Sequence, residues 1–292
     1  MTLDDEEWLA DRFEEHRGRL RAVAYRMLGS LAEADDAVQD TWIRVSRSQA
    51  SEVENLGGWL TAIVARVCLN VLRSRNLRKE ESLPIHLPDL IVSGPEEEAV
   101  LADSVGLALL VVLDTLTPAE RLSFVLHDMF QLPFEDIASM VGRSPAAARQ
   151  LASRGRRRVK GADLPTPASD LGRQRQVVNA FFAAAREGDF AGLVAVLDPE
   201  VVLRADFGPK HPDASRVIRG IAAVAENARS LPGAELLPVL VNGAPGVVIK
   251  VGGRPFAIMG FIVVAGKIVE IDAIADPSRV RSLAAGFLSA AR

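Results

Sequence analysis

Cationic side chains recur along residues 149–160, which read RQLASRGRRRVK. Guanidinium groups can pair with guanine edges in the major groove of DNA or with phosphate oxygens. On a helix the apolar residues of this segment fall on one arc and most of its cations on the opposite arc. The pattern predicts a DNA-reading helix, with a solvated basic helix end as the alternative. The candidate contacts are Arg149, Ser153, Arg154, Arg156, Arg157 and Lys160.

Two helices and a turn must position these side chains. A first helical pattern stops at Gly142, because glycine readily takes the left-handed conformation that ends a helix. Ser144 is placed to cap a second helix, and Pro145 fits the first turn, where a missing N–H costs nothing. Upstream, Thr117 and Glu120 form a capping-box pattern that starts a helix over about 118–130. The segment from 133 to 160 is therefore predicted to be a helix-turn-helix.

Two further charged helices precede this one. Residues 59–79 form an apolar helix whose second half is basic, which suits DNA contact but also suits the dipole of a helix end. Residues 31–45 form an amphipathic helix that turns acidic residues to solvent. A solvated face is the alternative for these carboxylates. The exposed residues of the acidic helix are Asp35, Asp36, Gln39 and Asp40.

Composition narrows the class of protein. A chain of 292 residues with 49% hydrophobic residues suits two or three globular domains. Its net charge of −4 disfavours a general nucleic-acid-binding protein and is compatible with a basic protein partner. The single cysteine, Cys68, is expected to be a small buried residue and excludes a disulfide within the chain. The acidic N-terminus and the lack of an uninterrupted membrane-spanning apolar run predict a cytoplasmic protein.

Linker-like sequences divide the chain. Prolines and glutamates interrupt the helical pattern at 80–98, and a Gly/Pro/Ser-rich stretch follows the basic helix. After it, two helices broken at Gly188-Asp189 precede strand-like runs separated by turns. We expect two all-α domains followed by an α+β domain whose strands form an antiparallel meander. The expected boundaries are 1–79, linker 80–98, 99–162, linker 163–170, and 171–292.

With these pieces in order, the first 160 residues resemble a bacterial RNA polymerase sigma factor of the extracytoplasmic-function type. ADDAVQDTWIRV is similar to the segment that such proteins dock on core RNA polymerase. GGWLTAIVARVCLNVLRSR is similar to the segment that reads the −10 promoter element, and the helix-turn-helix to the reader of the −35 element. The resemblance implies polymerase and promoter DNA as partners and no cofactor or metal. It implies −10 contacts by Arg66, Asn70, Arg73 and Arg75.

The C-terminal part resembles a SnoaL-like domain, a cone-shaped sheet wrapped by helices, through VVNAFFAAAREGDFAGLVAVLDPEVVLRAD. A sigma factor with this extension is similar to the SigJ-type subgroup, in which the added domain is expected to modulate activity. LPIHLPDL occupies the position where this subgroup carries a proline-rich motif, and the resemblance implies contacts between the sigma core and a second motif near the end of the chain. It also implies a possible small-molecule ligand and a monomer when free. The motif residues are Asp276, Pro277 and Arg279.

Two other classes of function remain open from the residues alone. SnoaL-like relatives include cyclases and isomerases, for which the polar candidates would be Asp206, His211 and Asp272, with Arg204 or Arg254 holding an anion. Asp206 and His211 flank a Gly-Pro loop, however, so we expect them to be surface residues. A helix-turn-helix repressor with a ligand-sensing domain is the second alternative, and it leaves the acidic helix unexplained.

Overall fold

The computed structural model describes residues 3–48, 53–78, 87–94, 106–162, 170–228 and 233–290. The chain forms two compact units, and each contains two separate segments of sequence. Unit 1 comprises Met1–Glu81 and Leu109–Asp163, and unit 2 comprises Ser82–Ala108 and Leu164–Arg292. Residues 82–108 therefore group with the C-terminal domain, whereas the sequence suggested a linker followed by the start of the second helical domain.

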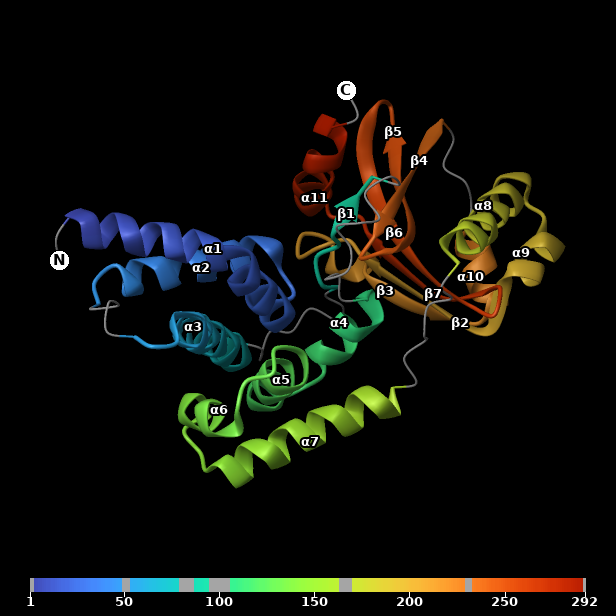
Figure 1. Ribbon diagram of the computed structural model, residues 1–292. Helices are drawn as coiled ribbons and strands as arrows, with labels where there is room; N and C mark the ends of the chain where they lie inside the picture. Colours follow the sequence, from blue (N-terminus) through green and yellow to red (C-terminus); the bar gives the residue numbers. More distant parts are fainter. Residues whose placement is uncertain are drawn as a thin grey trace. The chain divides into compact units, whose positions relative to one another are not determined.

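The first three helices of unit 1 pack against one another (Figure 1). Apolar side chains are buried between them. They are α1 (Leu3–Leu28), α2 (Leu31–Val45) and α3 (Leu56–Arg78). The helix predicted over 31–45 is confirmed as α2: Gly29, with a φ of 71°, follows the end of α1, and Ser30 caps α2. The segment Leu56–Arg75 of α3 has the length and composition of a membrane span, but its Leu60, Val64 and Cys68 are buried inside this unit.

The remaining helices of unit 1 begin with α4 (Leu107–Asp114), whose first two residues group with unit 2. The expected capping box of Thr117 and Glu120 is present and starts α5 (Pro118–Phe124), which continues into a π-helical turn, Val125–Met129. The predicted helix-turn-helix is confirmed. It consists of α6 (Phe134–Val141), left-handed Gly142, the cap residue Ser144 and α7 (Pro145–Gly161).

Unit 2 contains a seven-stranded sheet in the order β1-β4-β5-β6-β7-β2-β3. The expected antiparallel meander is correct for β4 to β7, but β2 runs parallel to β7 and the sheet is mixed. The strands are β1 (Val92–Ser93), β2 (Leu197–Asp206), β3 (Arg216–Arg219), β4 (Ala234–Val241), β5 (Ala244–Val251), β6 (Arg254–Val264) and β7 (Lys267–Ile274). With its helices this is the expected α+β fold.

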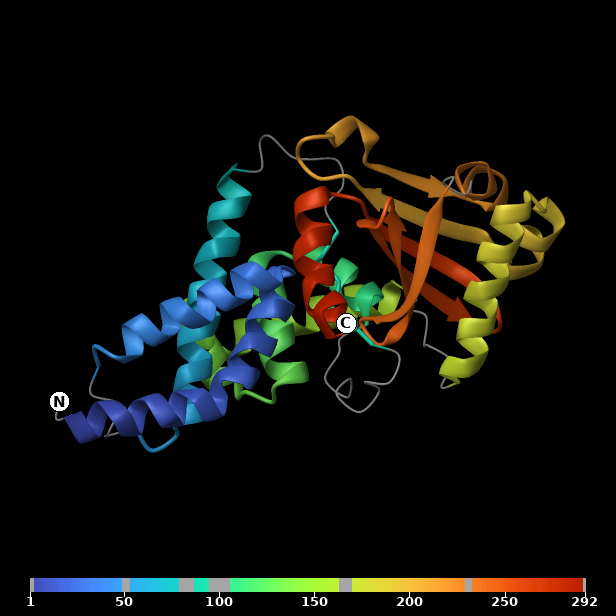
Figure 2. The same cartoon turned by 90° about the horizontal axis from the view of Figure 1, so that it is seen from above.

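Helices cover both faces of this sheet (Figure 2). One face packs against α8 (Leu171–Glu187), α9 (Phe190–Val196) and α10 (Ile221–Asn227) through one apolar cluster. The other face carries α11 (Pro277–Ala290), which also contacts β1. The sequence analysis did not identify β1, β3 or α11. For α11 a start signal was available, because Asp276 and Pro277 form a cap followed by a first-turn proline.

Candidate functional site

The second helix of the helix-turn-helix has one packed face and one exposed basic face. Ala148, Leu151, Ala152 and Gly155 are buried, as the arc predicted. Arg149, Arg157 and Lys160 are exposed and repeat at helical spacing, so they lie along one side of α7. The Arg149 guanidinium lies over the ring of Phe134 in α6, 5.1 Å from its centroid. Helix α7 thus presents a cationic face, and α6 holds one of its arginines in position through Phe134.

The predicted arginines of α7 divide into two groups. Arg154 pairs with Glu120 at 3.1 Å, and Arg156 pairs with Asp128 at 2.7 Å. These ion pairs tie α7 to α5 and to the π-helical turn of the same unit. Arg157 and Lys160 have no ion-pair partner among the described residues. They are therefore available to an external anion, whereas Arg154 and Arg156 already neutralise carboxylates.

The basic half of α3 shows the same division. Arg66, Asn70 and Arg73 are exposed and follow one another at i, i+4 and i+7 on one side of the helix. Arg75 instead donates to the carbonyl of Leu28 at 3.0 Å and forms an ion pair with Glu33. It thereby joins α3 to the end of α1 and the start of α2. Of the four −10 candidates, three share an open face and the fourth bridges helices.

The acidic residues of α2 border a groove against α3. Asp36, Gln39 and Asp40 line it, together with the partly exposed Ile43 and with Val67 of α3. Asp35 lies outside this lining and pairs with Arg21 of α1 at 2.6 Å. The groove therefore combines an acidic rim with apolar surface, which suits a protein partner that is basic with apolar anchors.

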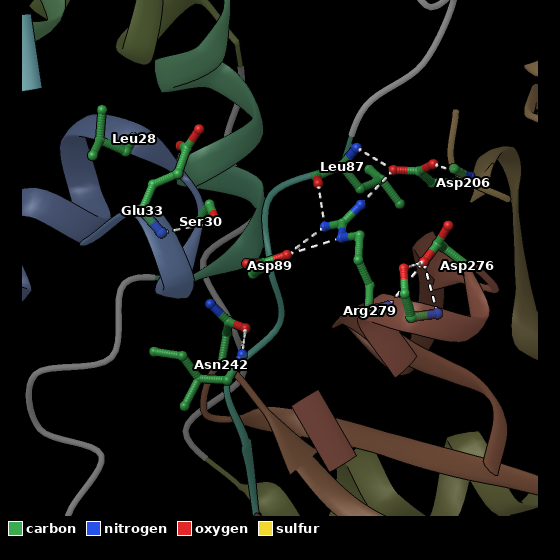
Figure 3. A network of polar contacts seen from close by, with 12 residues as sticks. Leu28, Ser30, Glu33, Leu87, Asp89, Asp206, Asn242, Asp276 and Arg279 are labelled. Atoms are coloured by element: carbon green, nitrogen blue, oxygen red, sulfur yellow. Dashed lines mark hydrogen bonds and ion pairs between the residues drawn. The ribbon is translucent and has the colours of Figure 1, made fainter. Parts of the chain in front are cut away.

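In unit 2, Arg279 of α11 holds residues 87–89 in an extended conformation against the sheet (Figure 3). Its guanidinium donates to Asp89 Oδ1 at 2.7 and 2.9 Å, to the carbonyl of Leu87 at 2.7 Å and to Asp206 Oδ2 at 2.7 Å. The Leu87 amide also donates to Asp206, at 2.9 Å. Leu87, Leu90 and Asp206 are almost fully buried. We call this cluster, formed by Leu87, Asp89, Asp206 and Arg279, the Arg279 network.

Backbone geometry fixes the arginine in place. The Asp276 carboxylate accepts hydrogen bonds from the amides of Ser278 and Arg279, so it caps the start of α11. Burial raises the pKa of Asp276, but the hydrogen bonds from the Ser278 hydroxyl and from the two amides, together with the charge of Arg279, outweigh burial and lower the pKa, which keeps the cap ionised. Gly208 has a φ of 77°, and a Cβ there would lie 2.0 Å from the Asp276 carboxylate, so only glycine fits.

The edge of the sheet extends the contact. Asn242, at a φ of 50°, accepts from the Ile91 amide through its side chain and donates to the Ile91 carbonyl through its own amide, both at 2.9 Å. Beyond it, Val92 and Ser93 pair with β4 as strand β1. The sequence analysis named Asp276, Pro277 and Arg279 as candidate contacts, but it did not name Asp89 or Asn242. Their partners are about 150 to 190 positions distant in the chain, and local patterns carry no sign of them.

The polar candidates for catalysis do not meet in a cavity. Residues alternate along β2, so Leu203 and Ala205 face the helix-covered cavity of unit 2, while Arg204 and Asp206 face the opposite side. Asp206 is 1% exposed, so the expectation that it is a surface residue was wrong. His211 is exposed, as expected, and Arg254 is exposed at the start of β6. Neither of these two lines the cavity.

Arg204 and Asp272 belong to a second buried polar group on that opposite face. The Arg204 guanidinium contacts Glu270 at 3.0 Å and Asp272 at 3.1 Å. Burial raises the pKa of Asp272 to about 6, an effect that Glu270 increases and the Arg204 charge only partly offsets. The second oxygen of this carboxylate has no hydrogen-bond partner within the described structure. The group is an ion cluster on two parallel strands, in which Asp272 is buried and Arg204 and Glu270 are half-buried.

Two family models match the helical part of the chain. The Sigma-70 region 2 model matches residues 12–78, and the Sigma-70, region 4 model matches residues 106–159. The first match contains the acidic groove and the open face of α3. The second contains the helix-turn-helix.

Relatives match beyond these regions. The ECF RNA polymerase sigma factor SigJ of Mycobacterium tuberculosis is 38% identical over 213 residues, which are 71% of this chain and 68% of the relative. The probable ECF RNA polymerase sigma factor SigI of the same organism is 34% identical over 277 residues, 92% of this chain and 94% of the relative. The crystal structure of Mycobacterium tuberculosis SigJ aligns with this chain with a TM-score of 0.70 at 31% identity. The alignment covers 92% of this chain and 97% of the SigJ chain.

Proposed function

Because this chain belongs to the extracytoplasmic-function family of RNA polymerase sigma factors, we propose that it recruits core polymerase to promoters through three surfaces of unit 1. The observation that carries this proposal is the order of the two sigma regions together with their exposed faces. Each region contains side chains that are exposed and unpaired, next to others that are committed to internal ion pairs. The three surfaces are the acidic groove, the open face of α3 and the cationic face of α7.

The cationic face of α7 is proposed to contact the −35 promoter element. Arg149, Arg157 and Lys160 supply the charge, and Ser153 lies between them on the same side of the helix. The stacking of Arg149 on Phe134 pre-orients its guanidinium, which reduces the side-chain entropy lost on binding. Arg154 and Arg156 act as positioning residues, because their ion pairs fix α7 against the rest of the region.

The open face of α3 is proposed to contact the −10 element through Arg66, Asn70 and Arg73. Arg66 also approaches Ser139 of α6 at 3.4 Å. Arg75 supports this face from within, since its bonds to Leu28 and Glu33 join three helices. The groove at Asp36, Gln39 and Asp40 is proposed to bind a basic surface of core polymerase, which accounts for acidic charge in a DNA-binding protein.

The C-terminal unit is proposed to modulate activity by binding the segment between the two sigma regions. The Arg279 network holds Leu87 and Asp89, which lie between the residues matched to region 2 and region 4. A segment that is bound to unit 2 cannot move freely with either region. The network therefore supports control by the chain's own extension, through Asp276, Pro277 and Arg279. The sigma assignment accounts for every feature that would support a repressor.

Run-off transcription with purified core polymerase and a promoter library tests the assignment. Initiation should depend on the added protein. Arg149→Ala/Arg157→Ala should abolish −35-dependent transcription and leave polymerase binding intact, while Asp36→Arg/Asp40→Arg should abolish co-purification with polymerase. Matched controls change equal charge elsewhere on unit 1: Arg12→Ala/Arg17→Ala for the first pair and Asp11→Arg/Glu15→Arg for the second. Duplex binding without polymerase-dependent initiation would instead indicate a repressor.

A further inference from the structure

Unit 2 contains a cavity of about 290 Å³ between α8 and the concave face of the sheet. This is about twice the volume of the 150 Å³ cavity that accommodates a benzene molecule and lies at the lower end of ligand-pocket volumes. The room comes from small side chains on the strands, since Ala205, Ala257 and Ala273 project where larger residues would fill the space. Phe181 and Phe182 of α8 form part of the opposite wall.

The lining is apolar except at three residues. Arg186 of α8, Arg216 of β3 and Asn227 of α10 contribute the polar side chains, and the described lining contains no carboxylate or imidazole. A proton-transfer reaction needs an acid or base beside the reacting atom, so this lining suits binding without chemical change. The cavity is also separate from the Arg279 network, which occupies the other face of β2.

Charge determines what the cavity can bind. Strand alternation places Arg216 on the same side of β3 as Ile218, which packs on the apolar core of the unit. Neither Arg186 nor Arg216 forms an ion pair with any residue that the structure describes. The side-chain nitrogen of Asn227 donates to the carbonyl of Ala223 at 2.8 Å, and the side-chain oxygen of Asn227 takes no part in that hydrogen bond. Both arginines are exposed, so their guanidinium groups lie where the cavity meets solvent. An apolar pocket with two such cations at its edge favours an anionic head on an apolar body.

We propose that this cavity binds a small amphipathic anion, namely an alkyl or aryl carboxylic acid whose carboxylate pairs with Arg216 and Arg186. The apolar body lies against the phenylalanines of α8 and the alanines of the sheet. The molecule binds and leaves unchanged. This inference goes beyond the sigma-factor function, because binding requires neither polymerase nor DNA.

Isothermal titration calorimetry on the full-length protein tests the proposal with sodium decanoate and 1-decanol, which share a tail and differ in charge. Decanoate should bind more tightly. Arg216→Gln should weaken decanoate binding about tenfold, the loss of one charge-assisted contact, and leave decanol binding unchanged. Arg219→Gln is the matched control, because this exposed arginine lies in the same strand and points to its other side. Arg186→Gln is the second variant, from a different element.

Three outcomes would overturn the proposal: no binding of either probe, equal affinity for decanoate and decanol, or equal losses in the Arg216 and Arg219 variants. Hydrogen exchange of the β2 and β7 amides checks that each variant is folded. If this exchange matches that of the unmodified protein, a loss of binding reports on the contact between the arginine and the carboxylate and not on folding. Because the titration contains no polymerase, a negative result leaves the transcription assignment unaffected. A failed transcription assay would likewise leave the titration valid.

Discussion

Arg279 uses all three of its side-chain nitrogens inside unit 2, and one residue therefore controls how residues 87–89 are held. Its side chain is 17% exposed, that of Asp89 11% and that of Asp206 1%. Charges this well buried are costly unless they are paired, so the network depends on each member. The sequence shows the charged residues of the network, but it does not predict which of them pair, because Asp89 and Arg279 are 190 positions apart.

Removal of this arginine should release the extended segment. We expect Arg279→Ala to cost about 3–5 kcal/mol in stability of the network, because two buried carboxylates lose an ion-pair partner. Hydrogen exchange at the Leu87 and Ile91 amides in the full-length protein measures the effect. Arg281→Ala is the matched control, since this neighbouring arginine is exposed. Unchanged protection at Leu87 in the Arg279 variant would contradict the assignment of the network.

Asp272 should give unit 2 a pH dependence of unusual sign for a carboxylate. Its pKa is raised to about 6 in the folded state, against about 3.9 when unfolded. Between these values the folded state binds more protons, so the free energy of unfolding should fall as pH rises from about 4 to 6, by up to roughly 3 kcal/mol. Asp272→Asn should remove this fall.

Hydrogen exchange of the β7 amides at several pH values measures this fall in the free energy of unfolding. Tryptophan fluorescence does not report on unit 2, because Trp8, Trp42 and Trp59 all lie in unit 1. Glu270→Gln tests the source of the shift. It should lower the pKa of Asp272 by removing a neighbouring negative charge, and it should thereby shrink the pH effect without abolishing it. An identical pH profile in the protein and its Asp272→Asn variant would contradict the raised pKa.

Strands β2 and β7 each present two chemically different faces, and this explains both what the sequence predicted and what it did not. Apolar residues line the cavity, and the intervening residues Arg204, Asp206 and Asp272 form buried polar groups on the reverse. The period of two in VVLRAD already separates Arg204 and Asp206 from the cavity side. The burial of that reverse face could not be predicted, because residues 87–94 and α11 cover it from distant parts of the chain.

Helix α7 was predictable almost residue by residue, since its cap, proline and arc are local features. Its close approach to α5 was not. A Cβ at Gly155 would lie 2.9 Å from the Phe124 Cβ, whereas a Cβ at Gly161 would meet nothing within 4 Å.

We therefore expect Gly155→Ala to destabilise unit 1 by about 1–3 kcal/mol through overpacking, despite the better helix propensity of alanine. Gly161→Ala, at the end of the same helix, should be neutral or slightly stabilising. Urea unfolding followed by tryptophan fluorescence reports on unit 1 and compares the two variants. Equal stabilities would show that α5 and α7 can separate at no cost.

At the scale of the molecule, the chain passes from unit 1 to unit 2, returns to unit 1 and ends in unit 2. Composition shifts predicted linkers at 80–98 and 163–170, but they did not predict that residues 82–108 belong with the last unit. A cut after residue 162 therefore does more than remove a domain, because it also removes the surface that holds residues 87–94.

This interleaving makes two perturbations comparable. If the C-terminal unit acts through the Arg279 network, Arg279→Ala and truncation after Ala162 should shift run-off transcription in the same direction, and the point variant should reach a large part of the effect of truncation. Arg281→Ala should match the full-length protein. Opposite signs, or a point variant without effect beside a strong effect of truncation, would place the control elsewhere in unit 2.

The long separation between Asp89 and Arg279 also has a consequence during synthesis. At roughly 5–20 residues per second, the ribosome makes the arginine about 10–40 s after the aspartate. Both sigma regions are complete in the meantime, while Leu87 and Leu90 still lack the surface that buries them. Each newly made molecule thus passes through a period in which both sigma regions exist before the Arg279 network can form.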